Sequence, residues 1–148
     1  DGTTLSALCQ AFQEGDAAEV ENRFNEYLRK TISVRDTTVR REQKENFYHG
    51  LLLGLLGFKD AWYVISNRES GTGYSDILVE IDEEKIGIVI EVKYSESGNL
   101  DRECETALRQ IRERDYTSML HDDGMETILE YGIACHGKKC MVKIRRSL

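Results

Sequence analysis

The sequence predicts an α/β fold in which helices flank a mixed sheet and a helical hairpin precedes the sheet. Residues 74–81 alternate apolar and polar side chains with the period of two that is typical of a strand. Residues 86–93 are almost continuously apolar and β-branched, as expected for a strand covered on both faces. Four charged residues at 82–85 predict a tight turn between them. Helical patterns before and after this hairpin would supply the covering layers.

The length and composition favour one domain with a sizeable core. The chain has 148 residues and no proline, with 32% charged and 40% apolar residues. A run of about eighteen apolar residues is absent, and the first residues lack the layout of a signal peptide, so we expect a cytoplasmic protein without a membrane span. Because the sequence does not begin with methionine, we expect a fragment of a longer protein.

The net charge of −7 argues against a strongly basic surface that coats nucleic acid without specificity. The negative net charge does not exclude a nuclease, because acidic metal ligands themselves add negative charge. The four cysteines form no CxxC pair, which argues against a zinc site and favours free thiols in a reducing compartment. Two of them, Cys135 and Cys140, flank a predicted hairpin turn and could face each other.

Two helices are predicted at the start of the chain. The first ends at Gly15, and Asp16 with Glu19 resembles a capping box that opens the second. We expect residues 1–36, the hairpin and a linker, to pack on a domain formed by residues 37–148.

A long helix follows, which Thr37 or Thr38 would cap and Gly57 would end. Gly50 and Gly54 lie four apart on one side of the helix, which permits the close approach of another backbone. The predicted apolar face of this helix consists of Phe47, Leu51 and Leu55.

Two polar residues of this helix, Glu45 and His49, are four apart and so share one face. Taken alone, Glu45 is an ordinary solvated helix residue. His49 fits a phosphate contact, a group near a metal ion or a hydrogen-bonded histidine at the rim of the core, and the residues do not decide between these.

The other elements follow from local patterns. Residues 61–67 predict the first strand, and residues 68–73 predict a glycine-rich turn. After the central hairpin we expect a helix over residues 100–120 and strands over residues 128–135 and 141–144. The core stripe of the helix consists of Leu100, Cys104, Ala107, Leu108 and Ile111.

Basic side chains are candidates for contacts to phosphate. In the glycine-rich turn, Arg68 or Ser70 could touch a phosphate, although a turn role is favoured. Three helix residues, Arg109, Arg112 and Arg114, are predicted to be solvated charges, of which the first two could contact a nucleic-acid backbone. A basic tail is predicted as a phosphate-facing rim or as solvated charges at a chain end, and it consists of Lys138, Lys139, Lys143, Arg145 and Arg146.

Three charged residues converge at one end of the central hairpin. Glu91 and Lys93 are two apart at the end of the second strand, so they point to the same side. Asp76 stands at the entry of the preceding strand, beside that end. Charges that close a buried strand cost free energy unless they are paired or used, so we expect a functional site here.

Asp76, followed after fourteen residues by Glu91-Val92-Lys93, resembles the metal-binding core of the PD-(D/E)XK nuclease superfamily. The stretch from about residue 42 to 144 is similar to a group of these domains found at the C-terminal end of bacterial proteins that begin with an AAA-ATPase-like domain. Ser75 stands where the name of the superfamily has proline. The segments that carry the resemblance are residues 45–50, 66–71, 87–93 and 131–135.

This resemblance implies a restriction-endonuclease-like core of the order α-β-β-β-α-β and a Mg²⁺-dependent nuclease, most simply a deoxyribonuclease, in which Mn²⁺ could substitute. Asp76, Glu91 and the Val92 carbonyl would hold the metal. Glu45 would add a third carboxylate, and Lys93 would activate or orient the attacking water. The residues expected to contact the nucleic acid are His49, Arg68, Gln110, Lys138 and Lys139.

Gln110 and Tyr116 fall where many RecB-like nucleases carry a glutamine and a tyrosine near the site. Their spacing here is six residues rather than the usual four, so only Gln110 is taken over as a site residue. The sequence leaves open whether the protein has an associated AAA-type ATPase domain as a partner and whether it forms a homodimer. The alternative function is a catalytically silent nucleic-acid-binding or interaction domain that works with such an ATPase, which the acidic net charge favours. A purely structural α/β domain would require the charged residues to lie far apart.

Overall fold

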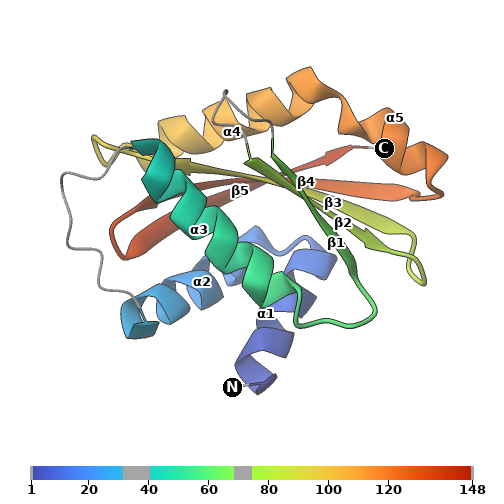
Figure 1. The fold of residues 1–148 in the computed structure, drawn as a ribbon, viewed down its shortest axis with the longest axis horizontal. Coiled ribbons are helices and arrows are strands. Elements are labelled where there is room, and N and C mark those ends of the chain that lie inside the picture. Colours follow the sequence, from blue (N-terminus) through green and yellow to red (C-terminus); the bar gives the residue numbers. More distant parts are fainter. Residues whose placement is uncertain (1, 32–40, 69–74, 148) are drawn as a thin grey trace.

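The sheet is the middle layer of a computed structural model that describes residues 2–31, 41–68 and 75–147 (Figure 1). Its strand order is β1-β2-β3-β4-β5, with β3 and β4 parallel and the other neighbours antiparallel. The strands are β1 (Tyr63–Arg68), β2 (Ser75–Ile81), β3 (Ile86–Tyr94), β4 (Thr127–His136) and β5 (Lys139–Ser147).

Helices cover both faces of this sheet. One face carries α1 (Gly2–Glu14), α2 (Ala17–Thr31) and α3 (Arg41–Leu56), and the other carries α4 (Leu100–Arg114) and α5 (Tyr116–Asp122) (Figure 1). The predicted α/β fold, with a mixed sheet flanked by helices and an N-terminal pair of helices, is therefore confirmed. None of the helices in the described ranges is both long and apolar enough to span a membrane.

The central hairpin forms as predicted, and its register decides which side chains share a face. Asp76 lies opposite Glu91, and Leu78 lies opposite Val89. Lys85 takes a left-handed conformation with φ 55° in the turn, which lets the two strands pair up to the turn. Alternation along β2 and β3 then directs Asp76, Leu78 and Glu91 to the α4 side and their neighbours to the α1–α3 side.

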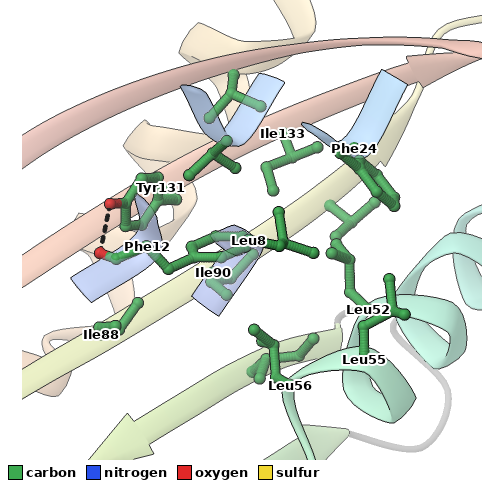
Figure 2. Close-up of a cluster of buried hydrophobic side chains, with 14 of the residues drawn as sticks. Leu8, Phe12, Phe24, Leu52, Leu55, Leu56, Ile88, Ile90, Tyr131 and Ile133 are labelled. Carbon is green, nitrogen blue, oxygen red and sulfur yellow. Dashed lines mark hydrogen bonds between the residues drawn. The ribbon is translucent and has the colours of Figure 1, made fainter. Parts of the chain in front are cut away.

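The larger core lies between the sheet and α1, α2 and α3 (Figure 2). Phe12 of α1 meets the ring of Tyr131 on β4 edge to face, with 4.9 Å between the ring centroids. The Tyr131 hydroxyl donates a hydrogen bond of 2.6 Å to the Phe12 carbonyl, which lies in the last turn of the helix, where carbonyls lack their usual helical partners. Between α1 and α2, Gly15 is left-handed with φ 74°, and Asp16 caps α2 by accepting a hydrogen bond from the Glu19 N–H.

The predicted apolar face of α3 is partly wrong. Phe47 is 49% exposed, while Tyr48 and Leu52 are completely buried. Leucines at five of the six positions 51–56 make the end of this helix apolar on every side, so periodicity does not single out one face. A methyl group added at Gly50 or Gly54 would meet nothing within 4 Å outside the backbone of the helix itself, so no described backbone makes the close approach that this spacing permits.

The predicted helix over residues 100–120 is two helices. Its core stripe is buried as expected, but the helix breaks at Asp115, which is left-handed with φ 49°. Aspartate tolerates this conformation better than most residues do. The final strand is longer than predicted, and the four cysteines are buried free thiols, with Cys135 opposite Cys140. The expected cap at Thr37 or Thr38, most of the linker and most of the turn at 68–73 lie outside the described residues.

An acidic group at the turn end of the hairpin makes the stability depend on pH. Burial, a hydrogen bond with Asp123 and the charges of Asp123 and Asp82 together raise the pKa of Glu80 from 4.5 to about 7. Between these two values the folded state binds the proton more tightly than the unfolded state does. The free energy of unfolding therefore falls as pH rises through this window.

We expect Glu80→Gln to abolish the fall in the free energy of unfolding that accompanies ionisation of Glu80. The variant should be more stable than the wild type at pH 8, by about 1 kcal/mol once solvent screening is allowed for, and nearly equal to it at pH 4. Urea unfolding at both pH values measures the difference. Glu84→Gln, an exposed residue of the same hairpin, is the matched control. A Glu80→Gln protein that is less stable than the wild type at pH 8 would contradict this expectation.

Candidate functional site

Two carboxylates and a lysine meet on the α4 side of the central hairpin. Asp76 and Glu91 face each other across β2 and β3, and each is only 1% exposed. The Lys93 ammonium lies 3.2 Å from Glu91 Oε1 and is also largely buried. The structure therefore brings together the three charged residues that the sequence predicts at this end of the hairpin.

Arg114 completes this group from the last position of α4. Its Nη1 lies 2.9 Å from each carboxyl oxygen of Asp76 and 3.2 Å from Glu91 Oε2. Only 17% of its side chain is exposed, so the prediction of a solvated charge is wrong for this residue. The signal is present in the sequence, because Arg114 lies three residues after Ile111 and so continues the buried stripe of α4.

Tyr116 is a second residue of the site that the sequence did not select. Its hydroxyl donates a hydrogen bond of 2.6 Å to Asp76 Oδ2 and accepts one from Asn67 Nδ2 on β1. The break at Asp115 turns the chain so that residues on both sides of it reach the same carboxylate. Burial and the hydrogen bond to Asp76 raise the pKa of Tyr116 to about 12, so the hydroxyl keeps its proton at neutral pH.

Burial and the neighbouring groups have opposite effects on the pKa of Asp76. Burial raises the pKa of its carboxyl group, whereas the Tyr116 hydrogen bond and the positive charges of Arg114 and Lys93 lower it. The net result is a raised pKa, which shows that the loss of hydration is only partly offset by these partners.

Gln110 lies one helical turn before Arg114, on the same face of α4. Its Oε1 is buried and has no hydrogen-bond partner among the described residues. Buried acceptors are rarely left unsatisfied, so we expect a donor such as a water molecule at this oxygen.

The donor chemistry of the site fits a hard divalent cation. Asp76 and Glu91 offer the carboxylate oxygens that Mg²⁺ prefers, and three of those oxygens already surround one positively charged nitrogen of Arg114. In the described ranges no three or more His, Cys, Asp or Glu side chains form a group that could hold a metal ion. Asp76 and Glu91 would supply two carboxylates, and water would fill the positions that no other protein oxygen takes, as is usual for Mg²⁺.

Glu45 lies in a separate polar cluster at the end of β3. Its Oε2 accepts hydrogen bonds from the Tyr94 N–H at 3.0 Å and from Arg41 Nε at 3.2 Å. Arg41 also bonds Glu103, which ties α3 to α4. The structure does not place Glu45 in one group with Asp76 and Glu91.

The side chains of His49 and Val92 lie on the opposite face of the sheet from the two carboxylates. His49 is buried on the α1–α3 side, where its Nε2 lies 2.8 Å from Ser66 Oγ, as expected for a hydrogen-bonded histidine. The Val92 side chain also packs into the core on that side. The backbone of Arg68 ends β1 opposite Ser75, and its side chain is outside the described part of the structure.

The predicted basic tail divides into two parts. Lys138, in the turn between β4 and β5, and Lys139, the first residue of β5, are exposed at the end of the sheet where β3 also ends. Lys143 instead pairs with Asp101 and Glu105. The last two members are also engaged, since Arg145 pairs with Glu130 and Arg146 donates to the Glu14 carbonyl.

Comparison with known proteins agrees with this geometry. A scan against protein-family models matches residues 43–144 to a family described as "PD-(D/E)XK nuclease superfamily". A search of curated proteins gave no significant match. The matched range covers most of the chain and contains the whole β2–β3 hairpin, α4 and β4. The chain therefore belongs to the PD-(D/E)XK nuclease superfamily.

Proposed function

We propose that this protein is a metal-dependent nuclease that hydrolyses phosphodiester bonds in DNA, with Mg²⁺ as the ion and Mn²⁺ as a substitute. The observation that carries the proposal is the convergence of Asp76, Glu91 and Lys93 on one face of the hairpin. These residues supply the ligands for a hard cation and a positive charge beside it, which is what hydrolysis of a phosphodiester requires.

Each of the three residues has a distinct task. Asp76 and Glu91 hold the metal and thereby fix the position of the phosphate. Lys93 orients or activates the attacking water and offsets the negative charge that grows on the phosphate oxygens. When bound, the metal polarises the phosphate and lowers the pKa of the water. Glu45, from the separate cluster at the end of β3, would join the proposed ligand set through water, and the Val92 carbonyl would add a further oxygen.

DNA would approach over the end of the sheet where β3 ends. Lys138 and Lys139 are exposed there, close to Ser95, whose carbonyl lies 2.7 Å from His136 Nδ1 at the start of the same turn. Exposed lysines at this end of the sheet can attract the phosphate backbone despite the acidic net charge of the whole chain. The free thiols suit a cytoplasmic protein.

The direct test is the incubation of the protein with end-labelled linear duplex DNA, single-stranded DNA, branched DNA and RNA in Mg²⁺ or Mn²⁺. Products that require the metal, disappear with chelator and are lost in Asp76→Ala are the expected result. The pattern of products then distinguishes cleavage from the ends from cleavage within the chain. The absence of products from every substrate, with a folded protein, would overturn the proposal.

Lys93 offers a prediction about the chemical step. Lys93→Met keeps the length of the buried side chain but removes its charge, so we expect kcat to fall about 10²–10⁴-fold. Metal binding, measured by calorimetry, should persist because both carboxylates remain. Lys85→Met, at the exposed turn of the same hairpin, is the control. Cleavage by Lys93→Met at the wild-type rate would show that the ammonium has no part in the reaction.

A second candidate is a catalytically silent binding or interaction domain that works with an AAA-type ATPase. The ion pairs of Arg114 with Asp76 and Glu91 and of Lys93 with Glu91 favour it, because the two positive charges balance both carboxylates without a metal. Calorimetry separates the two candidates, since a silent domain of this kind would bind neither Mg²⁺ nor Mn²⁺ at these carboxylates.

A further inference from the structure

The position of Arg114 Nη1 is the position expected of a metal ion. A terminal guanidinium nitrogen carries two hydrogens, yet this one lies within 3.2 Å of three carboxylate oxygens from Asp76 and Glu91. Both carboxylates are 1% exposed, so they need a positive charge at this point whether or not a metal is bound.

We propose that Arg114 is a built-in counter-ion that a divalent cation must displace, so that Arg114 sets the affinity of this site for metal. The inference rests on the proposed function, because it takes Asp76 and Glu91 to be the metal ligands. Metal–oxygen bonds of about 2 Å would place the ion among the same oxygens that now contact Nη1. Two cations cannot share them, since their repulsion is strong where water is largely excluded.

The position of Arg114 in the chain allows it to leave. It is the last residue of α4 and precedes Asp115, whose left-handed conformation ends the helix. Its side chain is 17% exposed, against 1% for the carboxylates beneath it, so it can withdraw toward solvent while they stay in place. A guanidinium remains charged at any ordinary pH, so it yields the site by moving and not by losing a proton.

Arg114 therefore stabilises the metal-free protein and at the same time lowers the affinity of the site for metal. Without metal, Arg114 keeps the buried carboxylates paired, and loss of one partner of a buried ion pair is strongly destabilising. With metal, displacement of the arginine subtracts from the binding free energy, which lowers the apparent affinity. The inference thus predicts opposite effects of one substitution on stability and on metal affinity.

The test is calorimetric titration with Mn²⁺ of the wild type and of Arg114→Gln. We expect Arg114→Gln to bind Mn²⁺ at least tenfold more tightly, because it keeps a polar side chain but removes the competing charge. Arg112→Gln removes an exposed charge from the same turn of α4 and should bind as the wild type does. Comparison with this control separates local competition from the general effect of a lost positive charge.

The Tm of thermal unfolding is a second measurement. It tests the role of Arg114 even if Arg114→Gln is poorly folded without metal. We expect Arg114→Gln to have a lower Tm than the wild type in chelator and to gain more from saturating Mn²⁺, since the ion replaces the missing charge. Arg114→Lys keeps a positive charge without the planar fork. Its Mn²⁺ affinity and its Tm should therefore lie between those of the wild type and those of Arg114→Gln.

The outcomes separate the inference from the function on which it rests. Equal or weaker Mn²⁺ binding by Arg114→Gln, with metal-dependent cleavage by the wild type, would overturn the role of Arg114 and leave the nuclease standing. Absence of Mn²⁺ binding in every variant, together with absence of cleavage, would overturn both.

Discussion

Asp76→Asn is expected to reduce metal-dependent cleavage by about a thousandfold or more while the fold is preserved. Asparagine has nearly the shape of aspartate, its carbonyl oxygen can still accept the hydrogen bond from the Tyr116 hydroxyl, and Arg114 retains Glu91 as its ion-pair partner. It lacks the negative charge that binds the cation. Loss of a metal ligand removes several kcal/mol of transition-state stabilisation, and each 1.4 kcal/mol or so is a factor of ten in rate.

The measurement is the initial rate of DNA cleavage at saturating Mg²⁺, with circular dichroism to confirm the fold. Asp82→Asn is the matched control, because it removes the same charge from an exposed position in the turn of the same hairpin. A rate for Asp76→Asn within a few-fold of that of Asp82→Asn would place the reaction elsewhere in the molecule.

Gly132→Ala is expected to cost about 3 kcal/mol of stability. On β4, the new methyl group would lie 2.5 Å from the Cys104 carbonyl oxygen and 3.0 Å from Leu108 Cγ. A real side chain does not come so close to a backbone oxygen, so α4 must move away from the sheet. Because α4 carries Arg114, the same shift should also disturb the carboxylate site.

Urea unfolding measures this cost, and Gly50→Ala supplies the contrast. Gly50 lies on the exposed side of α3 with no neighbour within 4 Å, so alanine there should stabilise the protein by roughly 0.5–1 kcal/mol through helix propensity. If Gly132→Ala were as stable as the wild type, the close contact between α4 and β4 would be disproved.

The central hairpin could be predicted from the sequence because the information that specifies it is local. Alternation in β2, the β-branched run of β3 and a four-residue turn fix both the register and the faces of the strands. That register alone places Asp76 beside Glu91, and the two-residue spacing places Lys93 on the same side. The three central residues of the site therefore follow from local sequence patterns.

Tyr116 could not be placed in the same way, and for Arg114 the spacing from Ile111 indicates the buried face of α4 but not the contact with Asp76. Their approach to Asp76 depends on where α4 ends, and a left-handed Asp115 has no periodic signature in the sequence. In an unbroken helix, Tyr116 would lie about 200° around the axis from Arg114, on the opposite side. The position of Glu45 was equally hidden, because the Tyr94 N–H that it binds becomes available only at the end of β3.

The most direct measurement of the central claim is the location of Mn²⁺ by anomalous diffraction from crystals grown with the ion. We predict one ion bound by both Asp76 and Glu91 at metal–oxygen distances of about 2 Å, with the Arg114 guanidinium withdrawn from its present contacts. The contradicting result is a saturated crystal in which Arg114 still bridges the two carboxylates and the only bound ions lie away from Asp76.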